Sequence, residues 1–84
     1  MKHTLKSWTP YFEDMVSGDK AFDLRLAERV YAVGDEVEFI EWDRAPGGPT
    51  GRTLTRRIVY VLEASADGQR FGLKAGHVVL GLAP

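Results

Sequence analysis

The sequence contains no cysteine, so neither disulfide bonds nor thiolate-bound metal ions can stabilise the fold. It also lacks an apolar run long enough for a signal peptide or a transmembrane helix. An excess of one charge is missing as well, because 11 basic residues stand against 12 acidic ones. These absences favour a cytoplasmic protein with no membrane contact, and they exclude a protein that coats nucleic acid through its net charge alone.

The composition predicts one small domain that spans residues 1–84. A chain of 84 residues lies near the lower limit for folding without covalent or metal cross-links, and its hydrophobic content of 44% allows a compact core. His3 and His77 lie far apart in the sequence, and no spaced pair of carboxylates accompanies them. The pair Gly47-Gly48 does not precede a helix, so it is not a phosphate-binding loop. We therefore expect neither a metal nor a cofactor.

Local patterns predict a strand followed by a short helix at the start of the chain. Residues 2–8 alternate weakly between polar and apolar side chains, which indicates a strand. Thr9 and Pro10 predict the helix start, with the Thr9 hydroxyl as the N-cap and proline in the first turn. Gly18 predicts the helix end, because glycine readily adopts the left-handed conformation that closes a helix.

The stretch that follows this helix carries the most distinctive chemistry of the sequence. Residues 20–27 predict a strand, and strict alternation places Asp23 and Arg25 on one face and two apolar side chains on the other. The apolar side chains are those of Phe22 and Leu24. Lys20 stands at the entry of the strand, so two cations and a carboxylate are expected close together beside a helix terminus.

The rest of the chain predicts further strands separated by turns. Residues 28–32 fit either a loop or a distorted turn, and the Pro/Gly-rich residues 45–51 predict an exposed hairpin loop. The expected strands are 36–43, 52–64, 70–73 and 77–82. We expect a bulge in the first of them, because its apolar side chains change parity, and burial on both faces in the second half of strand 52–64. The fold class is therefore α+β and mainly β: a small, closed or nearly closed barrel with one short helix between its first two strands.

Charged residues are segregated along the middle of the chain. Acidic side chains gather within residues 35–43 and basic ones within residues 44–57. This pattern predicts a hairpin in which an acidic strand pairs with a basic one, each cross-strand pair contributing up to about 1 kcal/mol.

Gly18, Lys20, Asp23 and Arg25 together spell G-x-K-x-x-D-x-R. This octet resembles the G-x-K-x-x-E-x-R signature of ASCH domains, a branch of the PUA-like superfamily. The resemblance extends over nearly the whole chain, to a family of very small, mostly uncharacterised bacterial and phage proteins of PUA-like fold. It rests also on the helix start 10–12, on Val33-Gly34-Asp35, and on the segments 41–52, 59–62 and 71–80.

The resemblance implies a PUA-like (ASCH-type) β-barrel that binds RNA or a modified nucleobase in a cleft between barrel and helix. Some small ASCH proteins are instead amidohydrolases that remove an acyl group from the N4 amine of cytidine-type nucleosides. Their catalytic lysine matches Lys20, Asp23 stands in the place of their threonine, and Glu63 is the nearest candidate for their glutamate. A protein-interaction module is a third hypothesis, with the Pro/Gly loop and the acidic strand as its surfaces.

Each candidate binding residue also has a purely structural interpretation. Arg25 suits a phosphate or a base edge, but equally a salt bridge with Asp23 that holds the strand. Lys20 faces either a ligand or solvent. Further candidates are the aromatic residues Trp8, Tyr11 and Trp42, which could stack on a base or fill the core, and Arg56, a cation at the barrel rim or at an exposed strand end.

Overall fold

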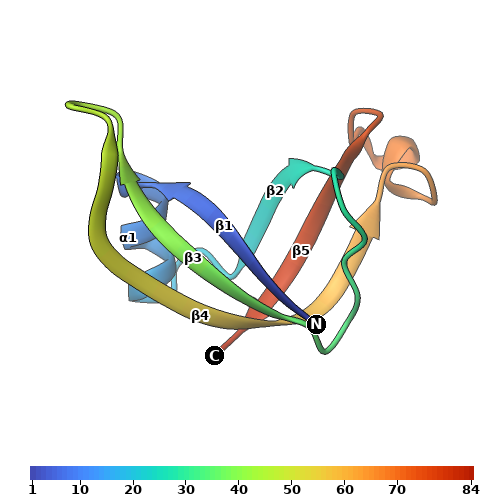
Figure 1. Cartoon of the computed structure of the whole chain (residues 1–84). Coiled ribbons are helices and arrows are strands. Elements are labelled where there is room, and N and C mark those ends of the chain that lie inside the picture. Colours follow the sequence, from blue (N-terminus) through green and yellow to red (C-terminus); the bar gives the residue numbers. More distant parts are fainter.

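The computed structural model describes residues 1–84 (Figure 1). Its elements follow the order β1 (Lys2–Trp8), α1 (Thr9–Ser17), β2 (Phe22–Leu26), β3 (Glu36–Asp43), β4 (Gly48–Glu63), the 3-10 helix η1 (Gly68–Phe71) and β5 (His77–Ala83). The protein is therefore mainly β, and the predicted single α-helix between the first two strands is confirmed. Neither helix is both long and apolar enough to cross a lipid bilayer.

All five strands form one sheet in the order β1-β3-β4-β5-β2, and only the pairing of β1 with β3 is parallel. The long strand β4 holds the central position, pairing with β3 through its first half and with β5 through its second. It bends between the halves, so the sheet curls into a half-barrel (Figure 1). The register shifts between Ile58 and Tyr60, opposite Gly81, where a Cβ atom would lie 3.0 Å from that of Tyr60.

The curled sheet stays open between its edge strands, β1 and β2, so the predicted barrel is present as an open half-barrel and not as a closed one. In a closed barrel, backbone hydrogen bonds would join these two edges; here a side chain links them instead. Arg25 Nη2 on β2 donates a hydrogen bond of 3.2 Å to the carbonyl oxygen of Lys6 on β1. The opening between the two edges is called the seam below.

The hydrophobic core lies inside the curl of the sheet. It consists of Leu5, Phe12, Met15, Tyr31, Val37, Phe39, Ile58, Val78, Leu80 and Leu82. Helix α1 packs against β1 and β3 and contributes Phe12 and Met15, each 1% exposed. Since its nine residues form little more than two turns, the helix depends on this packing for its stability.

The outer face of the sheet has no covering layer, and this explains why the prediction of burial on both faces of β4 was wrong. Phe22 and Leu24 share one face of β2, as predicted, but they are the exposed side chains, at 49% and 53%, while Asp23 is 5% exposed. In the second half of β4 only Ile58 is fully buried, and Val59 and Tyr60 are exposed. Alternation identified which residues share a face, but it could not show which face the core would cover.

Several predicted element boundaries were wrong for local reasons. Trp8 occupies the N-cap position, and the Thr9 hydroxyl donates to the carbonyl oxygen of Trp42 at 3.5 Å instead of capping α1. The hairpin loop is shorter than predicted because β4 already begins at Gly48. The bulge predicted in β3 is confirmed by a register shift between Ile40 and Trp42.

The segment predicted as a strand at 70–73 forms the end of the 3-10 helix η1 instead. Gly68 starts this helix at a position where a Cβ atom would lie 2.8 Å from both the Glu63 carbonyl oxygen and Leu73 Cδ2. Gly72 ends it in the left-handed conformation, with φ of 95°. The segment therefore belongs to one tight turn that Gly68 allows to lie close to the end of β4.

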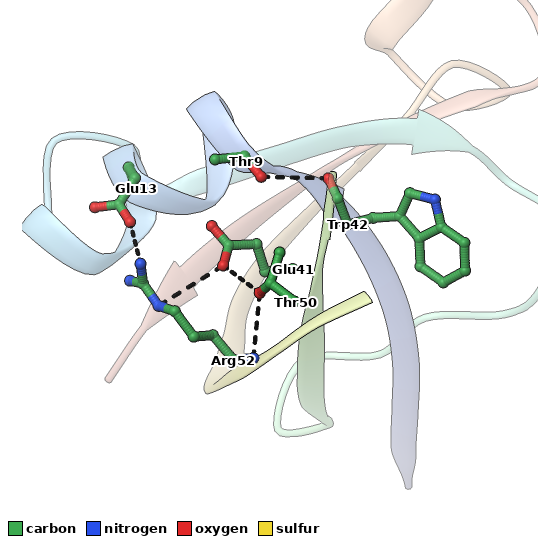
Figure 2. A network of polar contacts seen from close by, with 6 residues as sticks. All are labelled: Thr9, Glu13, Glu41, Trp42, Thr50 and Arg52. Atoms are coloured by element: carbon green, nitrogen blue, oxygen red, sulfur yellow. Dashed lines mark hydrogen bonds and ion pairs between the residues drawn. The ribbon is translucent and has the colours of Figure 1, made fainter. Parts of the chain in front are cut away.

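A polar network fixes α1 to the β3–β4 hairpin (Figure 2). The Glu41 carboxylate on β3 is 2% exposed and accepts a hydrogen bond from the Thr50 hydroxyl on β4. Arg52 on β4 lies between two carboxylates: its Nη1 donates to Glu13 on α1, and its Nε lies 3.7 Å from Glu41 Oε1. The acidic strand β3 therefore pairs with the basic strand β4, as predicted. One ion pair, between Glu41 and Arg52, joins the two strands, and Arg52 also reaches Glu13 on the helix.

A second polar cluster joins β1 to the turn before β3. His3, 2% exposed, contacts Asp35 Oδ2 through its Nε2 at 2.8 Å, and its ring lies 4.8 Å from the ring of Tyr31. The Asp35 carboxylate also accepts the N–H of Ala32 at 3.0 Å and contacts the Met1 amino group at 3.1 Å. These hydrogen bonds, that of His3 first, lower the pKa of Asp35 from 3.8 to about 2, whereas burial raises the pKa of Tyr31.

The lowered pKa of Asp35 predicts a specific loss of stability in acid. Its contribution is fully present above the unfolded-state pKa of 3.8 and is lost as the pH falls through the folded-state pKa of about 2. We expect the stability difference between the wild type and Asp35→Asn to shrink between pH 4 and pH 2. Urea unfolding at several pH values measures this difference, with Asp67→Asn, in an exposed turn, as the control. A difference that stays constant over this range would contradict the prediction.

Candidate functional site

A cleft lies at the seam between β1 and β2, beside α1. It has a volume of about 460 Å³. Its lining consists of Lys6, Ser7, Trp8, Tyr11, Lys20, Phe22, Asp23, Leu24 and Arg25. The site therefore draws on both edge strands and the helix, and it exists because the sheet stays open between those edges.

An ionic cluster on the β2 side holds a buried carboxylate between two cations. Lys20 Nζ lies 3.3 Å from Asp23 Oδ1, and Arg25 Nε donates to Asp23 Oδ2. The side chains of Lys20, Asp23 and Arg25 are 16%, 8% and 22% exposed. The structural interpretation holds because the three residues form ion pairs. The ligand-binding interpretation stays open because the same residues line an open cleft.

The local chain path explains how Lys20 reaches this cluster. Gly18 adopts φ of 89° and donates its N–H to the carbonyl oxygen of Met15 at 3.2 Å, which ends the helix as predicted. The Lys20 N–H then donates to the carbonyl oxygen of Asp14 at 2.9 Å. This tight turn brings Lys20 back over the entry of β2, three residues before Asp23.

Aromatic side chains form much of the cleft wall. Trp8, Tyr11 and Phe22 line it with exposures of 39%, 50% and 49%, so none of the three is a core residue. Two of them also contact cations: Lys20 Nζ lies 5.2 Å from the centroid of the Phe22 ring, and the Arg44 guanidinium lies 4.6 Å from that of Trp8. Cations stacked on exposed aromatic rings hold those rings in place without burying them.

Three of the predicted site residues do not line the cleft. Trp42 lies under Lys6, whose Nζ is 4.0 Å from the centroid of a Trp42 ring, so it supports a cleft residue from outside. Arg56 Nη2 donates to the carbonyl oxygen of Met15 at 3.3 Å, near the end of α1. Glu63 is exposed at the end of β4, where its carboxylate lies 3.5 Å from the Ser65 hydroxyl.

Four cleft residues were missed as candidates: Lys6, Ser7, Phe22 and Leu24. Lys6 and Ser7 lie on β1, and the alternation of polar and apolar residues in this strand does not indicate that it borders the seam. Leu24 and Phe22 were assigned only as the apolar face of their strand. Their position at the unpaired edge of the sheet exposes them to the cleft, and edge position depends on strand order rather than on local sequence.

The arrangement suits a ligand that is flat, polar at its edge and accompanied by negative charge. Three cations, Lys6, Lys20 and Arg25, line the cleft against the single carboxylate of Asp23. Each oxygen of that carboxylate is engaged by one cation and retains capacity to accept a further hydrogen bond. No cluster of three or more potential metal ligands occurs in the structure.

Comparison with known protein families gives a match that covers nearly the whole chain. The sequence model of a family described as a domain of unknown function, DUF3850, matches residues 2–82. The chain belongs to the DUF3850 family. No curated protein is similar enough in sequence to be recognised as a relative. The match to DUF3850 runs from β1 to β5, so it includes every element that lines the seam cleft.

Proposed function

We propose that this DUF3850 domain binds RNA or a modified nucleobase in the seam cleft. The observation that carries the proposal is the buried Asp23 carboxylate, held by Lys20 and Arg25 on the wall of a cleft lined by aromatic rings. A carboxylate accepts hydrogen bonds from the amino and ring N–H groups on base edges. Aromatic side chains stack on unpaired bases, and cations contact phosphates.

The size and charge of the cleft support this ligand class. Its volume of about 460 Å³ lies within the range of roughly 300–1,000 Å³ that is typical of small-ligand pockets. The whole chain has a net charge of −1, so the surplus of cations at the seam is a local feature. A local basic site suits recognition of one or a few nucleotides better than coating of a long duplex.

We also propose that the half-barrel is a PUA-like fold of the ASCH type. The proposal is supported by the octet G-x-K-x-x-D-x-R, whose Lys20, Asp23 and Arg25 all line the cleft. In this interpretation the ligand lies between the sheet and α1, as the family resemblance implies. An experimental structure with a bound nucleoside would test it, and a nucleoside bound away from the seam would contradict it.

Binding is expected to depend on the two cations beside Asp23. Fluorescence titration with nucleosides and short RNAs, using Trp8 at the cleft as a probe, measures the affinity. Lys20→Ala and Arg25→Ala should each weaken binding about tenfold or more, because a charge-assisted hydrogen bond contributes roughly 1.5–3 kcal/mol. Lys74→Ala and Arg57→Gln, at exposed positions away from the cleft, are matched controls. Absence of binding, or equal affinity in all variants, would overturn the proposal.

A second candidate function is hydrolysis of an N4-acylated cytidine-type nucleoside. It is favoured by the contact of 3.3 Å between Lys20 Nζ and Asp23 Oδ1 in an open cleft, which pairs a lysine with a carboxylate at the proposed base site. Glu63 lies outside the cleft, so Asp23 would have to act as the carboxylate in this reaction. Incubation with N4-acetylcytidine tests the idea, and lack of turnover would eliminate it.

A further inference from the structure

A second cavity adjoins the seam cleft at the start of helix α1. It has a volume of about 350 Å³ and is lined by Thr9, Pro10, Tyr11, Asp43, Arg44 and Ala45. Tyr11 lines both cavities, so they adjoin at this residue. The second cavity lies between the helix start and the turn of the β3–β4 hairpin, two elements that the sheet brings together.

A cation stands at the junction of the two cavities. The Arg44 guanidinium lies 4.6 Å from the centroid of a Trp8 ring, and Trp8 lines the seam cleft while Arg44 lines the second cavity. The exposed Trp8 ring thus contacts the cation of the second cavity and also forms part of the wall of the seam cleft. A guanidinium in this position can contact a phosphate that links two adjoining nucleotides.

The carboxylate of the second cavity has a fixed orientation. Asp43 Oδ1 accepts the N–H of Ala45 at 3.0 Å, which ties the side chain to the hairpin turn. Its other oxygen makes no hydrogen bond within the protein and can accept one from a base or a ribose hydroxyl. The two cavities therefore repeat one set of groups: an aromatic wall, a carboxylate acceptor and at least one cation.

We propose that the second cavity is a second nucleotide subsite, so that the ligand is a strand of two or more nucleotides. This inference rests on the proposed function and deepens it, because it selects RNA over a free nucleoside. One base lies in the seam cleft, the next lies beyond Tyr11, and Arg44 contacts the phosphate between them. Stacking on exposed rings tolerates any base, so the second subsite adds affinity with little sequence preference.

The test compares ribonucleoside 5′-monophosphates with ribodinucleotides of the same bases at several salt concentrations. A second occupied subsite should make the dinucleotides bind about tenfold more tightly or better. In Arg44→Gln this gain should fall to about twofold, and the slope of log affinity against log salt should become shallower by about 0.7. Arg57→Gln, an exposed arginine on β4 with the same loss of charge, should leave the gain and the slope unchanged.

The outcomes separate this inference from the function on which it rests. Monophosphates that bind as tightly as dinucleotides would overturn the second subsite but retain the seam cleft as a nucleotide site. Equal effects of Arg44→Gln and Arg57→Gln would also overturn it. Failure of every probe to bind would overturn both proposals. Tyr11→Leu provides an independent check, because loss of a wall shared by both subsites should weaken dinucleotides more than monophosphates, with the fold verified by circular dichroism. An equal loss for both ligands would place Tyr11 in the seam cleft alone and count against the second subsite.

Discussion

Asp23→Asn is expected to lower the free energy of unfolding by about 2–3 kcal/mol, because it leaves two partly buried cations without their shared carboxylate. Asp23 is 5% exposed, and both of its oxygens are engaged, one by Lys20 and one by Arg25. Asparagine has nearly the same shape, so the loss would report the missing charge rather than a cavity. The same variant should also bind nucleotides more weakly, since it loses the charged acceptor for the base edge and the group that orients both cations.

Urea unfolding of the purified variant measures this effect. Asp19→Asn is the matched control, because Asp19 lies in the turn just before β2 and is exposed, and we expect its stability to stay within about 0.5 kcal/mol of the wild type. Equal stabilities for Asp23→Asn and Asp19→Asn would show that the ion pairs contribute nothing measurable. In that case the buried carboxylate would have to be retained for ligand binding alone.

Phe12→Ala is expected to have the largest effect on stability, a loss of about 4 kcal/mol. Phe12 is 1% exposed in the core, and the Arg52 guanidinium lies 5.1 Å from the centroid of its ring. The substitution would remove one of the two buried side chains by which α1 packs on the sheet. Because a domain of this size has a total stability of roughly 4–13 kcal/mol, the loss would amount to about a third or more of the total.

The neighbouring residue offers a control within the same helix. Tyr11 is 50% exposed, so Tyr11→Ala should change stability by no more than about 1 kcal/mol while removing a wall of the cleft. Phe12→Leu, which retains most of the apolar volume, should fall between the two in thermal unfolding. A Phe12→Ala protein as stable as Tyr11→Ala would mean that α1 is held by the Glu13–Arg52–Glu41 network instead.

The elements with strong local signals could be predicted closely from the sequence. The strand at 36–43 was predicted with its observed bounds and with its bulge, because alternation and a change of parity are written into neighbouring residues. The helix end at Gly18 followed from the conformational freedom of glycine, which needs no tertiary context. Predictions failed where a segment's state depended on a distant partner, as for η1, which packs against the end of β4.

The candidate site shows the same division. Lys20, Asp23 and Arg25 lie within six residues, so the turn and the strand alone bring them together. Lys6 and Arg44 reach the same region only through the curl of the sheet and the β3–β4 hairpin, over separations that no local pattern spans. Glu63 was chosen for its place in the order of strands, and the bend of β4 leaves it outside the cleft.

The sequence by itself determined the number and type of most elements and the cluster of Lys20, Asp23 and Arg25, since these follow from spacing along the chain. Only the tertiary structure decided that the sheet stays open, that the apolar side of β2 faces outward and that two cavities meet at Tyr11. The physical reason is that a strand's alternation defines two faces but not which one is buried. That choice depends on strand order and curvature, which arise when all five strands pack around one core.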